Sequence, residues 1–585
     1  MEAPSDPVDS SQQISKQKGG LRTMPFIIAN EAFEKVASFG LLPNMILYLK
    51  GGYHMSTASG ISILSLWGSA SHFLPIVGAF ISDSYMKKNK NQIGLFGMVL
   101  LWLTAMIPQA RPPKCDPSLH NCKSPTSGQL TLLFSAFVFM GIGAGGIRPC
   151  SLAFGAEQVD TEGNPKKKRA LQTFFNWYYA SATVSVLIAL TIIVYVQDHL
   201  GWKIGFAIPA ICMFLSGFFF MLATSRYIKA KPNKSLFTGF AQVTVAAIRK
   251  RNVPLPKYVE DGYYHHASGS KMVVPSEKLR FLNRACIIRS REKDLTSDEI
   301  ATNPWSLCTV TQVEELKALL KVLPMWSTGI VMSLSMNAHS FPLLQASSMD
   351  RHLTSGFEVP AGSFTMFMIA TIVIWLPLYD RLIVPVLAKI TRKPYGIGLK
   401  QRMGIGIVVI CLSSVVAAIV EHNRRRNAIS QGFSENPQGV LDMSAMWLVP
   451  QYCLGGIAEA FYAVGQNEFY YSQFPNSMSS IATSLFGLGM AFGNLLGGVM
   501  VRVVDDATKG EGKDSWVSSN INKGSIDYYY WMLAVIGVIN ILYFILCSWA
   551  YGPCEGERTK IKDEDEEIKD EELSKAHEVE MVSSA

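Results

Sequence analysis

The feature that most constrains this chain is a series of long apolar runs, each close to the length that crosses a bilayer. About 20 apolar residues span the hydrocarbon core as a helix, and a helix satisfies its backbone hydrogen bonds without help from water. Only 17% of the 585 residues are charged, against about 25% in soluble proteins. The runs therefore predict an all-α membrane protein with about twelve spans. The expected spans are 24–49, 61–82, 92–110, 129–154, 174–196, 204–224, 315–336, 362–387, 402–420, 444–469, 481–503 and 528–549.

A long polar stretch divides the runs into two groups of six, which is typical of secondary transporters built from two related halves. Within this stretch, 235–252 carries apolar residues at helical spacing. We interpret it as an amphipathic helix on the membrane surface, with a solvated connector as the alternative. The expected domains are a cytosolic tail at 1–23, an N-terminal bundle at 24–224, a cytosolic linker at 225–314, a C-terminal bundle at 315–550 and an acidic cytosolic tail at 551–585.

Lysine and arginine cluster in five segments that fall on one side of a twelve-span arrangement, so this side is expected to be cytosolic. The run Arg424, Arg425 and Arg426 falls on the other side and is the exception. The net charge of +8 thus reflects membrane orientation and does not indicate nucleic acid. Cys115 and Cys122 share a polar loop, where either a disulfide or two free thiols are expected. No metal or haem spacing appears among the cysteines, so no cofactor is expected.

Three charged residues, Glu31, Glu34 and Lys35, interrupt the first apolar run. Their spacing of i, i+3 and i+4 places them on one helix face, roughly 10–16 Å from the helix start. Charges at that depth cost a few kcal/mol each, so they are expected to face inward. Two acids and a base on one buried face can hold and pass a proton. The alternatives are a structural ion pair, or a span that starts later and leaves the charges at the membrane interface.

The fourth and tenth runs each contain a charged residue. Arg148 follows a series of glycines, and its planar fork of donors suits nitrate, a carboxylate or a sulfate. Alternatively, Arg148 reaches the cytosolic face or pairs with a glutamate of the first run. Glu459 lies in mid-span, where it can bind a substrate cation, carry a proton or balance Arg148. Glu468 lies nearer the end of the same run and is expected to be structural.

Aromatic residues and a histidine complete the candidate substrate site. Tyr178 and Tyr179 follow Trp177 in the fifth run, and these three side chains either line a cavity or form an interfacial belt. Trp326 and His339 lie in the seventh run. His339 is a candidate for titration, although a single histidine is more often a hydrogen-bonded structural group.

Acidic residues close the second and the eighth runs at equivalent places. Asp83 ends one of these runs, and Asp380, followed by Arg381, ends the other. Their repeated position in the two halves suggests a gating role. The sequence contains no Walker A motif and no aspartyl-phosphate loop, so uphill transport would depend on an ion gradient.

These residues lie in motifs similar to those of the plant nitrate/peptide transporter family, within the proton-coupled oligopeptide transporters of the major facilitator superfamily. The resemblance implies twelve helices in two bundles, alternating access and proton symport. It implies proton coupling by an ExxE[K/R] motif, here Glu31, Glu34 and Lys35, and a central site containing Arg148 and Glu459. The matching segments are NEAFEK at 30–35, GGIRPCSLAFGAEQ at 145–158, FFNWYY at 174–179, PWSLCTVTQVEELK at 304–317, GIAEAFYAVGQNEFYYSQFP at 456–475 and MSSIATSLFGLG at 478–489.

The chain also departs from this family's patterns. Peptide-transporting members usually have lysine in place of Arg148, and their FYxxINxG pattern reads YYASATVS at 178–185 here. Both departures disfavour dipeptides. The histidine that binds nitrate in related transporters aligns with Ser335 or Met336, and His339 follows about one turn later. The connection after Asp83 is several residues shorter than the family pattern.

The expected function is a proton-coupled symporter, not an enzyme, for a small anionic solute, with nitrate as the leading candidate. One alternative is a transporter of hormones or of specialised metabolites such as glycosides, alkaloids or glucosinolates. Another is a sensor with the transporter fold and no net flux. The expected partners are a small-molecule substrate, protons and the lipid bilayer. The plasma membrane is the expected location and the vacuolar membrane the alternative.

Overall fold

The structure of the chain is a computed structural model. It describes residues 22–82, 90–113, 123–159, 167–227, 236–255, 263–266, 274–296, 299–336, 338, 340–354, 356–391, 396–436, 439–510 and 513–553.

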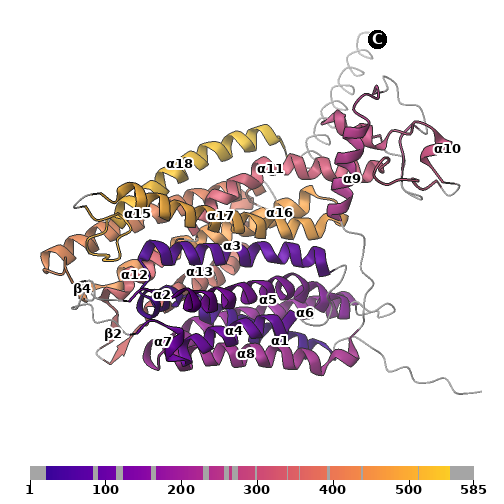
Figure 1. Ribbon diagram of the computed structural model, residues 1–585. Helices are drawn as coiled ribbons and strands as arrows, with labels where there is room; N and C mark the ends of the chain where they lie inside the picture. The colour runs from indigo at the N-terminus through magenta and orange to yellow at the C-terminus, as the bar shows by residue number, and fades with distance from the viewer. Residues whose placement is uncertain are drawn as a thin grey trace, which may run out of the picture.

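Long helices run side by side in two groups, an N-terminal half and a C-terminal half (Figure 1). Short strands gather at one end of the bundle, which we call the strand end. The segment between the halves lies at the opposite end, which we call the linker end. The N-terminal half contains α1 (Met24–Leu41), α2 (Met45–Tyr53), α3 (Thr57–Ser82), α4 (Lys90–Met106), η1 (Pro108–Ala110), α5 (Ser127–Val159), α6 (Lys167–Ile188), η3 (Ala189–Ile193), α7 (Val194–His199), α8 (Trp202–Leu222) and η4 (Thr224–Arg226).

The C-terminal half follows a linker that contains α9 (Leu236–Arg249), η5 (Arg280–Cys286) and α10 (Arg291–Asp294). Two minimal sheets form here, because β1 pairs in parallel with β4 and β2 pairs antiparallel with β3. The elements of this half are α11 (Val310–Met336), α12 (Ser340–Ser347), β1 (Met349–Asp350), β2 (His352–Thr354), β3 (Phe357–Glu358), η6 (Ala361–Phe364), α13 (Thr365–Leu378), η7 (Tyr379–Ile383), α14 (Val384–Thr391), α15 (Leu399–Ser430), β4 (Leu441–Ser444), η8 (Ala445–Leu448), α16 (Val449–Gln473), η9 (Asn476–Met478), α17 (Ser479–Thr508) and α18 (Ile526–Tyr551).

Nine helical segments in the described part of the chain are long and apolar enough to cross a membrane. Three expected spans are not among these nine: 24–49, which contains α1, 92–110, which contains most of α4, and 444–469, which contains most of α16. Two of these, α1 and α16, carry acidic residues that the sequence singles out. The helices that least resemble lipid-facing spans are therefore those with candidate chemistry, as expected when charged side chains face a protein interior.

The first predicted span is not one continuous helix. It ends as α1 at Leu41 and resumes as α2 at Met45. Pro43 lies in the break, and proline has no backbone N–H and clashes with the preceding turn of a helix. At the other end of α1, Pro25 occupies one of the first two positions, where its missing N–H is harmless. The sequence thus located the span but missed the proline break inside it.

The predicted amphipathic helix is present as α9, but its apolar face is used differently from our interpretation. Phe240, Val243 and Ala246 are buried in the same core as Leu282 and Val313, so this face packs on η5 and the start of α11. Ile248 and Phe237 stay exposed. Part of the apolar periodicity of α9 therefore reflects packing within the protein, and contact of its exposed residues with a membrane surface stays a prediction.

The two halves touch through α3 and α17, and through contacts toward the strand end. Ser62 Oγ of α3 donates to the carbonyl of Gly498 at 2.9 Å. Nearer the strand end, Lys50 Nζ donates to the carbonyl of Ser519 at 3.2 Å. An ion pair at 3.7 Å also joins Asp198, in α7, to Arg351, beside β2. Together these contacts join the two halves toward the strand end and close it.

Candidate functional site

Helix α1 places Glu31, Glu34 and Lys35, which we call the acid cluster, on its inner face. Lys35 Nζ lies 3.0 Å from Glu31 Oε1 and 3.3 Å from Glu34 Oε2. The Glu31 and Glu34 side chains are only 3% and 1% exposed, whereas Lys35 is 20% exposed. The carboxylates therefore point into the protein and not at lipid, while the amine keeps partial access to solvent.

Two serines occupy the carboxylate oxygens that Lys35 does not bind. Ser38 Oγ donates to Glu34 Oε1 at 2.7 Å, and Ser151 Oγ of α5 donates to Glu31 Oε2 at 2.7 Å. Each carboxylate thus binds the amine through one oxygen and a hydroxyl through the other. Sequence reasoning missed both serines, although their spacing was visible: Ser38 follows Glu34 by four residues, which is one helical turn.

The structure also bears on where the acid cluster lies along its helix. Because α1 begins at Met24, as the sequence predicts, the cluster lies seven to eleven residues from the helix start. At about 1.5 Å per residue this distance is roughly 10–16 Å. The helix start thus agrees with the one predicted, whereas the depth of the charges in the membrane stays a prediction. A purely structural ion pair is the alternative that requires an experiment.

The aromatic triplet of α6 is divided between two environments. Tyr178 is buried, and its side chain interacts with Glu31 and Ser151. Trp177 and Tyr179 are more than half exposed. Tyr178 therefore belongs to the surroundings of the acid cluster, and only the other two side chains remain available for a membrane belt or an open cavity.

Close packing of glycines positions α5 beside its neighbours. A Cβ atom at Gly143 would lie 2.3 Å from Gly94 Cα of α4, and one at Gly145 would lie 2.8 Å from the carbonyl carbon of Leu74 in α3. Only residues without a side chain allow helices to approach so closely. Position 148 lies in this helix, one turn before Ser151. The Arg148 side chain itself lies outside the described part of the structure.

Helices α16 and α11 carry the candidate site residues of the C-terminal half. Glu459 is partly exposed in the middle of α16, and no hydrogen bond or ion pair to its carboxylate is found among the described residues. Trp326 Nε1 of α11 donates to the carbonyl of Leu485 in α17 at 2.8 Å, and its ring meets Phe492 edge to face. The indole N–H of Trp326 already donates a hydrogen bond within the protein. Trp326 could therefore contact a substrate through its ring but not as a hydrogen-bond donor.

The remaining predicted residues are placed as follows. Asp380 and Arg381 are exposed in η7, a π-helical segment, and no ion pair involving either is found in the described part of the chain. Glu468 forms an ion pair at 2.9 Å with Arg402, which fits the structural role expected for it. The sites of His339, Asp83, Cys115 and Cys122 lie outside the described residues.

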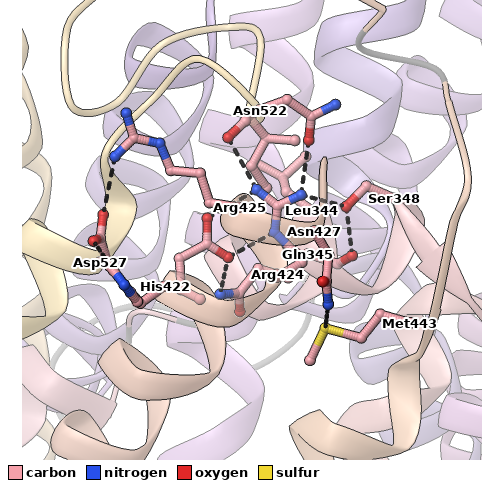
Figure 2. A network of polar contacts seen from close by, with 12 residues as sticks. Leu344, Gln345, Ser348, His422, Arg424, Arg425, Asn427, Met443, Asn522 and Asp527 are labelled. Atoms are coloured by element: carbon pink, nitrogen blue, oxygen red, sulfur yellow. Dashed lines mark hydrogen bonds and ion pairs between the residues drawn. The ribbon is translucent and has the colours of Figure 1, made fainter. Parts of the chain in front are cut away.

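A second acid–base pair, which the sequence analysis did not identify, lies near the strand end of α15 (Figure 2). Glu421 and Arg424 are both fully buried. The Arg424 guanidinium donates twice to Glu421, at 2.7 and 2.9 Å, and also to Ser348 Oγ, Asn522 Oδ1 and the Ile521 carbonyl. Guanidinium has five N–H donors, and all five are used.

This network explains the run of arginines that disagreed with the predicted orientation. Arg424 pairs with Glu421, and Arg425 lies 3.7 Å from Asp527, which also contacts His422 (Figure 2). Two of the three positive charges are therefore neutralised within the protein. The positive-inside preference concerns cationic loops near the membrane, so the run is a weak objection to a cytosolic linker.

The two acid–base groups differ in what they can do chemically. The Glu421–Arg424 pair has no donor left over, so it is suited to joining α12, α15 and the 515–525 segment. In the acid cluster a single ammonium, partly exposed, is shared by two buried carboxylates. Protonation of either carboxylate would leave the amine to the other. Such an arrangement can exchange a proton without losing all its contacts.

Comparison with protein families matches residues 91–517 to the family model described as PTR2, the POT family. Two Arabidopsis thaliana proteins are among the similar relatives. Protein NRT1/PTR FAMILY 1.2 is 53% identical over 569 residues, covering 94% of each chain. Protein NRT1/PTR FAMILY 1.1 is 53% identical over 568 residues, covering 94% of this chain and 96% of the other.

Solved structures show the same fold at much lower identity. An auto-inhibited POT family peptide transporter matches with a TM-score of 0.66 and 19% identity, covering 91% of this chain and 98% of the other. The POT family transporter PepTSo, crystallised in meso, matches with a TM-score of 0.64 and 16% identity, covering 91% and 98%. These matches confirm the predicted all-helical transporter fold.

Proposed function

Since this chain belongs to the POT family of proton-coupled transporters, in its NRT1/PTR branch, we propose that it is a symporter that moves a small anionic solute together with protons. It is a multi-pass membrane protein and not an enzyme. Nitrate is the leading candidate for the solute. The observation that carries the proposal is the acid cluster, in which two buried carboxylates share one partly exposed amine.

In this proposal the acid cluster carries the proton. Protonation of Glu31 or Glu34 from outside removes a negative charge from the cluster and weakens the hold on Lys35. Charge balance within the protein then favours an anion near Arg148, because an uncompensated buried charge is unfavourable. Proton and anion would therefore bind together, which is the requirement for coupled transport. Ser38 and Ser151 keep the carboxylates oriented throughout.

The substrate would lie between Arg148 and Glu459, one from each half. The guanidinium fork of Arg148 suits a planar anion, and Glu459 repels anions unless it is protonated or paired. Tyr179 and Trp326 would shape the remainder of this site, with His339 at its edge, and Tyr178 would link it to the acid cluster through Glu31. The closed strand end supports an alternating-access cycle, in which Asp83, Asp380 and Arg381 would belong to the gate at the linker end.

The direct test is Glu34→Gln, assayed by uptake across a range of external pH in oocytes. Expected is loss of the acid-stimulated part of uptake, with surface expression unchanged. Glu468→Gln is the matched control, because Glu468 pairs with Arg402 outside the acid cluster and should leave the pH dependence intact. Full acid stimulation in the Glu34→Gln variant would refute the proton-carrying role.

A second candidate keeps the same proton coupling but assigns a larger or less polar substrate, such as a hormone or a glycoside. It is favoured by Ser335 and Met336, which stand where related nitrate transporters have an anion-binding histidine. An uptake screen with nitrate, hormones and glycosides at acidic and neutral pH separates the two. Signalling without accumulation of any of these would instead support a sensor. A fluorescent fusion would distinguish the proposed plasma membrane location from the vacuolar membrane.

A further inference from the structure

The C-terminal half contains a pocket that is separate from the acid cluster. Its volume is about 60 Å³, and six helices (α11, α12, α13, α15, α16 and α18) and the turn before α12 contribute to its walls. Most of the lining side chains are buried, so the pocket lies inside the C-terminal bundle. Its polar lining residues are Ser335, Ser413, Ser414, Gln451, Tyr452 and Tyr530.

Gln451, in the first turn of α16, is the unusual member of this lining. Its side chain is 5% exposed, yet neither Oε1 nor Nε2 has a hydrogen-bond partner among the described residues. Ser413 Oγ donates to the backbone carbonyl of Gln451 and not to its amide group. Buried polar atoms are nearly always hydrogen-bonded, to protein or to ordered water. The Gln451 amide therefore requires a partner inside the pocket.

The same face of α16 leads from Gln451 toward Glu459. Gln451, Gly455 and Glu459 are spaced at i, i+4 and i+8, which places them in one row along the helix. Gly455 also lines the pocket, and a Cβ atom there would meet nothing within 4 Å, so the pocket reaches from Gln451 to the middle of this row. Glu459 is partly exposed at the end of the row, and no protein partner to its carboxylate is found in the described part of the chain.

We propose that this pocket is a water-binding site, in which Gln451 positions ordered water that extends along α16 to solvate Glu459. A water molecule needs about 10–15 Å³ of such space and two to four polar partners, so the pocket has room for a few. Among the described residues, its lining contains no charged side chain, which disfavours an ion as the occupant. The hydroxyl and amide groups disfavour a dry, apolar cavity.

The pocket also joins the buried network of the strand end. Tyr530 lines the pocket and donates to Gln345 Oε1 at 3.4 Å. Gln345 Nε2 in turn donates to Glu421 Oε2 at 2.7 Å, and Figure 2 shows Gln345 beside Arg424. Water held by Gln451 would therefore lie between two carboxylates. One is Glu421, whose partner Arg424 uses all five of its N–H donors, and the other is Glu459, which would be solvated by this water.

Radiolytic labelling of the full-length protein in lipid nanodiscs tests the proposal. Hydroxyl radicals formed from bound water oxidise adjacent side chains, even when those side chains are buried. Met336 and Met368 line the pocket, whereas Met325 and Met403 are buried elsewhere. Expected is oxidation of the two pocket methionines several-fold faster than that of the two controls. Equal rates would overturn the proposal, and this comparison needs no variant.

Gln451→Leu provides the second arm. It keeps a side chain of similar size but removes the amide, so oxidation of Met336 and Met368 should fall toward the rates of the controls. Gln466→Leu is the matched variant, because Gln466 is also buried in α16 but already donates to Tyr470, and it should leave the labelling unchanged. Undiminished labelling in Gln451→Leu would show that Gln451 does not hold the water.

Discussion

Two acid–base groups with similar helical spacing have opposite surroundings in this protein. In the middle of α1, Lys35 is shared by Glu31 and Glu34 and remains 20% exposed. Near the strand end of α15, Arg424 and Glu421 are both fully buried, and every guanidinium donor has an acceptor. Both groups obey the rule that charges inside a membrane protein face inward.

The difference shows that burial alone does not separate a structural pair from a functional one. A pair with every donor satisfied can change state only by breaking several hydrogen bonds at once, which makes it rigid. A pair with one partly exposed member and divided contacts can gain or lose a proton while keeping part of its contacts. We therefore propose a stabilising role for the Glu421–Arg424 network and proton exchange for the acid cluster.

The largest expected effect is on stability, at the Glu421–Arg424 pair, in which every guanidinium donor has an acceptor. Arg424→Met leaves Glu421 buried without its partner, and removing one member of a buried pair costs about 3–5 kcal/mol. Thermal unfolding of the detergent-solubilised protein should show a strong decrease in midpoint. Arg425→Met is the control, because that pair is longer and more exposed and such pairs contribute about 0–1 kcal/mol. Equal shifts would break the comparison.

At the acid cluster the expected effect is on transport and not on folding. Glu31→Gln keeps the shape of the side chain and an acceptor for Ser151, so stability should change by only about 1 kcal/mol. Accumulation of a transported solute against its gradient should nevertheless be lost. Counterflow, which needs no proton gradient, should persist. A large fall in unfolding midpoint, with transport of the surviving protein unchanged, would place this group with the structural pairs.

The serines sharpen the comparison at a smaller scale. Ser151→Ala and Ser38→Ala each remove one hydrogen bond to a carboxylate, which should lower the free energy of unfolding by about 0.5–1.5 kcal/mol. Since Ser151 joins α5 to α1 and Ser38 lies within α1, only Ser151→Ala should also slow uptake. Unfolding midpoints and initial uptake rates, measured on the same preparations, test both parts. Indistinguishable uptake in the two variants would argue against a role for the α1–α5 contact.

The smallest effect on stability is expected at His422, an exposed residue next to the Glu421–Arg424 pair. His422 is 66% exposed and lies 3.3 Å from Asp527, so His422→Ala should change stability by no more than about 0.5 kcal/mol. Asp527→Asn should have a larger effect, because Asp527 is buried and contacts Arg425 as well. If His422→Ala were the more destabilising of the two, the network would extend further toward the surface than its contacts indicate.

The sequence by itself determined the features that depend on local spacing and composition. Apolar runs of bilayer length located the helices, and i, i+3, i+4 spacing placed Glu31, Glu34 and Lys35 on one face, because both follow from helix geometry alone. Motif resemblance identified the family. The proline break after Leu41 was also readable from Pro43, although the length of the apolar run concealed it.

Only the tertiary structure decided which residues far apart in the chain meet. It placed Ser151 against Glu31, and Tyr178 against both Glu31 and Ser151. It also packed the apolar face of α9 on η5 and α11. It also paired two of the three arginines in the run of α15, Arg424 and Arg425, with acidic residues. The physical reason is that burial and hydrogen bonding depend on neighbouring helices, and helical periodicity says which face is apolar or charged but not what that face contacts.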